Sequence, residues 1–175
     1  MWPNANATRN PAKARDLENV CTTSALMDPA AFIGGDRVSA ISIADPTLCP
    51  HLQTDIIPSR IQLNMDFIRD ADLFMAYNDS NDQKYNMPAI NDFIEANNYG
   101  TVSWNTTANP SRGWNTPANA RLLAAEVKGW LVQFDPANES YYEEQYREYA
   151  KSFDAVEPTA EERKQLNQTS VIVML

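Results

Sequence analysis

The sequence predicts an α/β protein, with a parallel sheet of roughly four strands covered by helices and followed by a long helical segment. Short apolar runs at 36–45, 73–78 and 101–104 have the composition of buried strands. Segments with helical periodicity separate these runs. At 175 residues, the chain is long enough for one domain with a core and short for two.

The N-terminal part is predicted to hold an arm, a strand, a helix and a second strand. Residues 1–18 lack periodicity and predict a mobile arm. Residues 18–24 are strand-prone, and residues 25–35 have a short helical pattern that ends in two glycines suited to a C-cap. Residues 36–45 are too apolar for a strand with a solvated face, so a buried strand of a parallel sheet is predicted there.

The middle of the chain is predicted to alternate helices with strands. Residues 58–72 predict a helix, because Pro58 suits its first turn. Ile61, Met65 and Ile68 form an apolar stripe on that helix. The elements predicted after it are a strand at 73–78, a helix at 87–100 and a strand at 101–104.

Two helices are predicted after the last of these strands. Thr116 suits the N-cap, and Pro117 the first position, of a helix over 116–134. Asp135 and Pro136 end this helix and start another. The second helix carries an aromatic stripe that we interpret as a packing surface, formed by Tyr142, Tyr146, Tyr149 and Phe153. Beyond Pro158, a capping box and a C-terminal strand are predicted, the former at Thr159 and Glu162 and the latter at 170–175.

Composition and motifs exclude several classes of function. A net charge of -9, from 23 acidic and 14 basic residues, disfavours binding to nucleic acid. Neither of the glycine-rich phosphate-binding motifs occurs, and no Ser/His/Asp set can be assembled around the single histidine. We therefore predict a binding protein and not an enzyme. No apolar run approaches the length of a bilayer span, and the N-terminus lacks the apolar core of an export signal.

Two features favour a location outside the cytoplasm. Five sequons for N-glycosylation begin at Asn6, Asn78, Asn105, Asn138 and Asn167. Cys21 and Cys49 would be free thiols in a cytosol and a plausible disulfide outside it. We predict that they lie close enough in space for this bond.

Cys49 and His51 have the spacing of two metal ligands on one turn. The interpretation that we favour from this spacing alone is that they are ordinary loop residues. A structural zinc site needs three or four protein ligands, and the sequence offers no second histidine or C-x-x-C pair to complete one.

Three stretches resemble the N-terminal lobe of the zinc- and manganese-binding solute receptors of ABC importers. They are IGGDRVSAISIADPTLCPHLQTDIIPSRI, RDADLFMAYN and SRGWNTPANARLLAAEV, the last followed by LVQFDPANESYYEEQYREYAKSF. The resemblance runs through most of the chain, and its specific parts are the His51 loop and WNTPANA. It implies an arm at 1–18, an α/β lobe at 19–115, a helical linker at 116–169 and the first strand of a missing second lobe at 170–175.

The resemblance also implies a ligand site. His51 matches the first metal-ligating histidine of the family, whereas Arg112 stands where the second is expected. A guanidinium has no lone pair for a cation, and it suits an anionic ligand or a metal bound in an anionic chelate. Cys49 and Trp114 are further candidate ligand contacts, and Trp104 could add a stacking wall.

We therefore expect an extracytoplasmic receptor lobe for a divalent metal, zinc or manganese, or for a metal chelate. Its expected partner is the membrane permease of an ABC importer. Residues 170–175 would be an unpaired strand edge, through which copies could self-associate. The alternative is a structural or adhesive surface protein that keeps the fold without transport.

Overall fold

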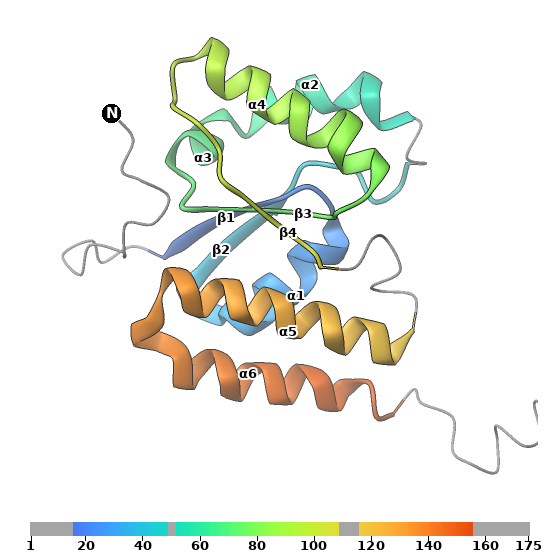
Figure 1. The fold of residues 1–175 in the computed structure, drawn as a ribbon, viewed down its shortest axis with the longest axis vertical. Coiled ribbons are helices and arrows are strands. Elements are labelled where there is room, and N and C mark those ends of the chain that lie inside the picture. The colour runs from blue at the N-terminus through green and yellow to red at the C-terminus, as the bar shows by residue number, and fades with distance from the viewer. Residues whose placement is uncertain (1–15, 49–51, 109–115, 156–175) are drawn as a thin grey trace, which may run out of the picture.

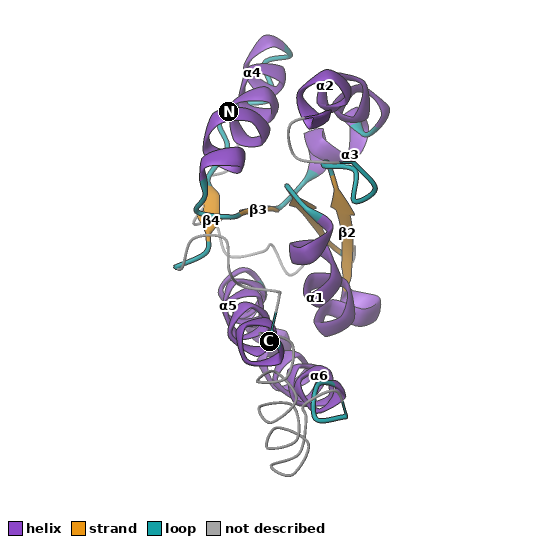
Figure 2. Cartoon of the chain, turned by 90° about the vertical axis from the view of Figure 1, so that its right-hand side faces the viewer, coloured by secondary structure: helices purple, strands orange, loops and turns teal. Residues whose placement is uncertain are grey.

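The computed structural model describes residues 16–48, 52–108 and 116–155, which form a sheet between two layers of helices (Figures 1 and 2). The predicted C-terminal capping box and strand, including 170–175, lie outside the described residues. In the described part of the chain, no helix combines the length and the apolar character needed to cross a bilayer.

The sheet is parallel, as predicted, and its strand order is β2-β1-β3-β4. The strands are β1 (Leu17–Cys21), β2 (Val38–Ser42), β3 (Leu73–Ala76) and β4 (Trp104–Thr106). Pairing of Val20 with both Ile41 and Phe74 places β1 at the centre. This order differs from the order along the chain, because the chain passes from β1 to β2 on one side and then crosses back over β1 to β3 on its other side.

Three details of the strands were predicted wrongly. β1 begins at Leu17, inside the predicted arm, because that side chain is buried in the core. β2 is an edge strand, and four of its five residues are only partly buried. The last strand occupies Trp104–Thr106 and not 101–104, since its pairing with β3 begins at Phe74 and Trp104.

Helices cover both faces of the sheet (Figure 2). One layer holds α2 (Gln53–Leu63), α3 (Met65–Asp70) and α4 (Met87–Ala96). The other holds α1 (Ser24–Gly34), α5 (Pro117–Phe134) and α6 (Glu139–Ser152). Short helical turns occupy Gly35–Arg37, Asp82–Asn86 and Pro136–Asn138, and the second of these is a π-helical turn that leads into α4.

The helix predicted over 58–72 is two helices that begin earlier. α2 starts at Gln53, which leaves Pro58 inside the helix, where it supplies no N–H. Burial of Ile57 and Ile61 holds this segment in place. The helix is interrupted at Asn64, whose backbone N–H donates to the carbonyls of Arg60 and Ile61.

Local signals at other helix ends are confirmed. Gly35 caps α1 with a φ of 55° and donates its N–H to the carbonyl of Ala31. The side chain of Thr116 accepts a hydrogen bond from the N–H of Asn119 at the start of α5.

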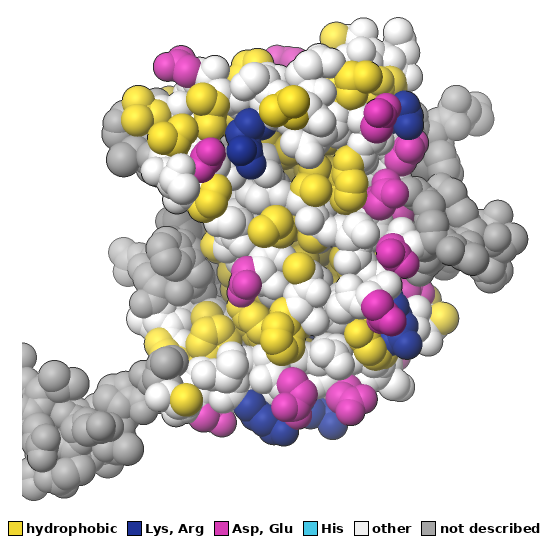
Figure 3. Space-filling model, turned by 180° about the vertical axis from the view of Figure 1, so that it is seen from behind, with side chains coloured by type: hydrophobic (Ala, Val, Ile, Leu, Met, Phe, Trp, Pro, Cys, Tyr) yellow, Lys and Arg dark blue, Asp and Glu magenta, His cyan; other side chains and the backbone are white. Residues whose placement is uncertain are grey.

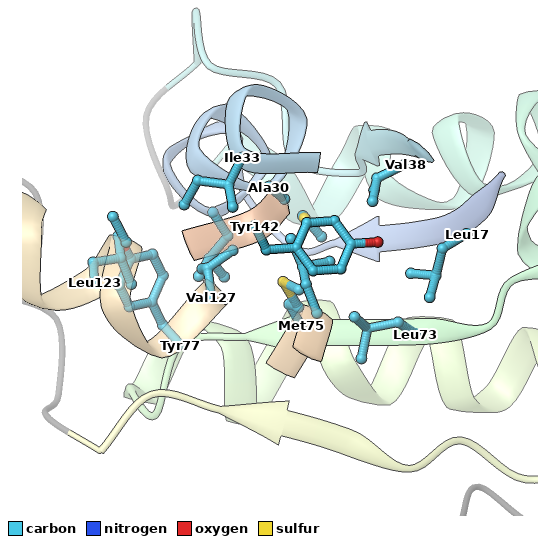
Figure 4. Packing of buried hydrophobic residues seen from close by; sticks show 14 residues of the cluster. Leu17, Ala30, Ile33, Val38, Leu73, Met75, Tyr77, Leu123, Val127 and Tyr142 are labelled. Carbon is cyan, nitrogen blue, oxygen red and sulfur yellow. The ribbon is translucent and has the colours of Figure 1, made fainter. Parts of the chain in front are cut away.

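The two faces of the sheet bury separate clusters. Leu17, Leu73 and Met75 pack against α1, α5 and α6 (Figure 4), whereas Val20 and Phe74 pack against α2, α3 and α4. This division follows the alternation of side chains along a strand. Tyr142, Tyr146 and Tyr149 of the aromatic stripe belong to the first cluster, with Tyr142 fully buried, and Phe153 packs on Tyr149, so the predicted packing role is confirmed.

Figure 3 shows the surface from behind, where acidic side chains are more prominent than basic ones. Many of the acidic side chains lie along one side of this view, and the hydrophobic side chains lie in small groups. This distribution agrees with the acidic net charge of the chain.

Candidate functional site

A pocket of about 430 Å³ lies at the carboxyl ends of β1, β2 and β3. Its walls come from the segments that follow these strands, at 23–25, 44–48 and 77–86, together with Gln53 from α2. Its volume falls in the range of small-molecule sites, about 300–1,000 Å³.

Topology explains the position of the pocket. The chain crosses from β1 to β2 on one side of the sheet and then reaches β3 on the other side of β1. The loops after β1 and β3 therefore diverge and leave a crevice, which is where open parallel sheets bind ligands.

A buried carboxylate, Asp82, joins the walls of this pocket. Its Oδ2 accepts hydrogen bonds from Oγ1 of Thr22, at 2.5 Å, and from the N–H of Tyr77, at 2.6 Å. Its Oδ1 accepts from Nδ2 of Asn86. The side chain is 1% exposed and connects the ends of β1 and β3 to the π-helical turn.

Burial dominates the electrostatics around this carboxylate. Desolvation raises the pKa of Asp82 above its ordinary value, although three donated hydrogen bonds act in the opposite direction. The negative charge of Asp79 raises it further. The pKa of the neighbouring Tyr77 phenol is also raised, first by burial and then by Asp82 and Asp79.

A second buried polar group, Gln53, fixes the wall that follows β2. Its Oε1 accepts from the N–H of Asp45 at 2.9 Å, and its Nε2 donates to the carbonyls of Asp45 at 2.7 Å and Leu48 at 3.1 Å. Arg60 donates to the carbonyls of Ile43 and Ser42, which ties the end of β2 to α2.

Asp45 shapes the same wall from its exposed side. Its Oδ1 accepts from the N–H and the hydroxyl of Thr47, and these bonds lower the pKa of Asp45. The guanidinium of Arg60, 3.6 Å from Oδ2, lowers it further.

The residues predicted to bind ligand lie outside the described ranges: Cys49, His51, Arg112 and Trp114. The described residues next to the first pair are Leu48 and Leu52, and Leu48 and Gln53 line the pocket. Trp104 is described and lies away from the pocket, since its ring packs on Phe74 and its Nε1 donates to Asn91 of α4.

Cys21 is a buried free thiol at the end of β1. Burial raises the pKa of this thiol, which disfavours the reactive thiolate. Its pairing with Cys49 stays a prediction, because Cys49 is outside the described residues.

The described residues do not complete a metal site. Within 16–48, 52–108 and 116–155, no group of three His, Cys, Asp or Glu side chains could hold an ion. Asp82 is committed to three hydrogen-bond donors, which leaves Asp45 and Asp79 as the other carboxylates of the pocket wall. A metal site here needs His51 or other donors outside these ranges.

Gln53, Tyr77 and Asp82 were not predicted from the sequence as pocket residues. One signal was available for Asp82, because it lies in the polar segment that follows the strand predicted at 73–78, and such segments lie at the ligand-binding edge of a parallel sheet. Gln53 carried no comparable signal, since its role depends on the fold of the wall that it contacts.

Comparison with known proteins gives a family match. The family model described as "ZnuA: Zinc-uptake complex component A periplasmic" matches residues 20–174. The comparison with curated proteins found no match.

Similar solved structures share the fold at low sequence identity. The metal-dependent lipoprotein YcdH from Bacillus subtilis is 19% identical, with a TM-score of 0.56, and the match covers 80% of this chain and 53% of that one. A Mn-bound periplasmic metal binding protein from candidatus liberibacter asiaticus is 17% identical, with a TM-score of 0.52 and coverages of 79% and 53%. The laminin-binding protein Lbp of Streptococcus pyogenes is 16% identical, with a TM-score of 0.53 and coverages of 81% and 54%. The chain thus spans about half the length of these proteins.

Proposed function

Because the chain belongs to the ZnuA family of solute-binding proteins, which are not enzymes, we propose that it is a receptor lobe of an ABC-type importer. Its proposed ligand is a divalent metal, zinc or manganese, or a metal chelate. It would work outside the cytoplasm and pass the ligand to a membrane permease. We further propose an α/β lobe at 19–115 and a helical linker at 116–169.

The observation that carries this proposal is the pocket at the carboxyl ends of β1, β2 and β3. Leu48 and Gln53 line it and stand on either side of the segment that carries Cys49 and His51. This arrangement supports His51 as a ligand, with Cys49 as a neighbouring donor. Asp45 and Asp79 would add negative charge that favours a cation.

Arg112 and Trp114 set the proposed preference between a bare ion and a chelate. A histidine at position 112 would supply a second nitrogen ligand, whereas arginine suits the carboxylates of a chelator. We therefore propose weak affinity for the bare ion, since tight metal sites need several ligands.

Calorimetric titration with zinc tests this function on three proteins: the natural chain, Arg112→His, and Arg112→His combined with His51→Ala. We expect weak binding, a measurable gain and loss of that gain, respectively. If Arg112→His does not change the affinity for zinc, the assignment of a metal site to His51 and position 112 is wrong. Asp92→Asn, a change at an exposed residue of α4, is the matched control.

A second candidate function is adhesion at the cell surface. The similarity to a protein described as laminin-binding favours it. Immobilised laminin is the probe, with the three zinc-test proteins as analytes. Saturable binding by all three, together with no zinc binding, would favour adhesion over transport.

We also propose glycosylation of the sequons. Among the described sequons, the side-chain amides of Asn105 and Asn138 donate to the carbonyl of Phe74 and to Asp135, and the amide oxygen of Asn78 accepts from Gln83. A glycan on Asn105 or Asn138 would have to replace its hydrogen bond. Intact mass measurement of the secreted protein tests this modification.

A further inference from the structure

Asp82 lies in the 77–86 segment of the pocket wall and joins it to the end of β1, which is distant in sequence. Thr22, immediately after β1, precedes the pocket residues 23–25. Tyr77, immediately after β3, and Asn86, at the end of the π-helical turn, both line the pocket. One carboxylate therefore joins two of the three segments that form the pocket wall, and it also ties the start of its own segment to the end of the π-helical turn.

We propose that Asp82 is a positioning residue for ligand binding in this pocket, and that gain of a proton on its carboxyl group rearranges the wall. The inference rests on the proposed function, because it assigns a proton-linked control to the same site.

Hydrogen-bond geometry explains how one proton has this effect. The ionised carboxylate accepts from all three donors. A proton on Oδ1 would face the amide donor of Asn86, so that amide must turn and present its oxygen. A proton on Oδ2 would face Thr22, whose hydroxyl can rotate to accept it, whereas the backbone N–H of Tyr77 has no such freedom. Protonation thus reverses a hydrogen bond in the wall.

The surroundings bring this proton exchange closer to neutral pH than in an exposed aspartate. Burial raises the pKa of Asp82, and Asp79 on the same loop adds to the effect. The phenol of Tyr77 and the thiol of Cys21 have raised pKa values and are neutral at ordinary pH. On the other elements packed against the turn, the charged groups are Asp55 and Arg60 of α2, and Asp92 and Glu95 of α4.

NMR titration of backbone amides tests the coupling without a ligand. The amide of Tyr77 donates to Asp82 and reports its ionisation directly. We expect the amides of Ser24, Ala25 and Asn81 to shift with the same midpoint, above the ordinary value of 3.8. Asp82→Asn should abolish this common titration, and Asp92→Asn should preserve it. Independent midpoints, or a titration that persists in Asp82→Asn, would overturn the proposal.

Thr22→Val is a second variant that keeps the carboxyl group. It removes one hydrogen bond to the ionised form, so the midpoint reported by Tyr77 should rise. An unchanged midpoint would contradict the assigned network, even if Asp82→Asn failed to fold.

Zinc titrations of the natural chain and Asp82→Asn, at pH values on both sides of the midpoint found by NMR, provide the functional measurement. We expect the ratio of their affinities to change at least threefold across the midpoint. A constant ratio indicates a purely structural role and overturns the proposal. If the natural chain binds no zinc, its proposed binding of the bare ion is contradicted, and the amide titration alone decides the role of Asp82.

Discussion

The hydroxyl of Tyr142, on α6, donates a 2.9 Å hydrogen bond to Oδ2 of Asp135, the residue that ends α5. Both residues are buried, and Nδ2 of Asn138 donates to the same oxygen at 2.7 Å. The bond therefore fixes the turn between the two helices from within the core.

Tyr142→Phe should reduce the free energy of unfolding by about 1–3 kcal/mol, because it removes a buried hydrogen bond to a carboxylate and keeps the ring. Urea denaturation measures the change. Tyr141→Phe is the control, since that hydroxyl makes an exposed 3.3 Å bond to Asp36, and a loss below about 0.5 kcal/mol is expected. Equal losses in the two variants would contradict the structural role of the Tyr142 hydroxyl.

Leu123 and Leu122 are adjacent on α5 and differ in burial, with exposed fractions of 4% and 59%. Leu123→Ala should cost about 2–5 kcal/mol by opening a cavity between α5 and the sheet. Leu122→Ala should change stability by no more than about 0.5 kcal/mol. Thermal unfolding of the two variants checks the difference, and the reverse ranking would mean that α5 packs through another face.

Gln53→Glu should destabilise the protein by about 1–3 kcal/mol, although the two side chains have nearly the same shape. The carboxylate cannot donate to the carbonyls of Asp45 and Leu48, and it places a charge beside them in a position that is 7% exposed. Gln62→Glu, on the exposed side of α2, is the control. Urea denaturation at pH 7 measures both, and equal stability in the two variants would contradict the stabilising role of the Gln53 hydrogen bonds to Asp45 and Leu48.

Glu143→Gln should cost only about 0.2–1 kcal/mol, since the ion pair between Glu143 and Lys128 is partly exposed and screened by solvent. The hydrogen bond from Lys128 lowers the pKa of Glu143 below its ordinary 4.5. This stabilisation is therefore present above pH 4.5 and is lost as the pH falls through the lower folded-state value. Unfolding measured against pH and salt concentration checks this, with Glu144→Gln as the control. A loss of unfolding free energy in Glu143→Gln that grew in high salt would contradict this account.

Local sequence signals predicted much of the architecture. Gly35 as a C-cap and Thr116 as an N-cap were predicted because each acts on its own helix end. Tyr142 and its stripe were predicted as packing surface from their helical spacing. The start of α2 was missed, because the buried contacts of Ile57 and Ile61 outweigh the preference of Pro58 for a first turn.

The sequence by itself determined the alternation of strands and helices, the parallel sheet and the family resemblance, because these follow from periodicity, caps and short motifs. Only the tertiary structure decided that β1 lies between β2 and β3, and that Asp82 is buried between their loops. Thr22 and Asp82 are 60 positions apart, and no local preference encodes their contact. The pocket exists because packing of the whole sheet brings such distant residues together, and its buried carboxylate is stable there because three donors from those segments surround it.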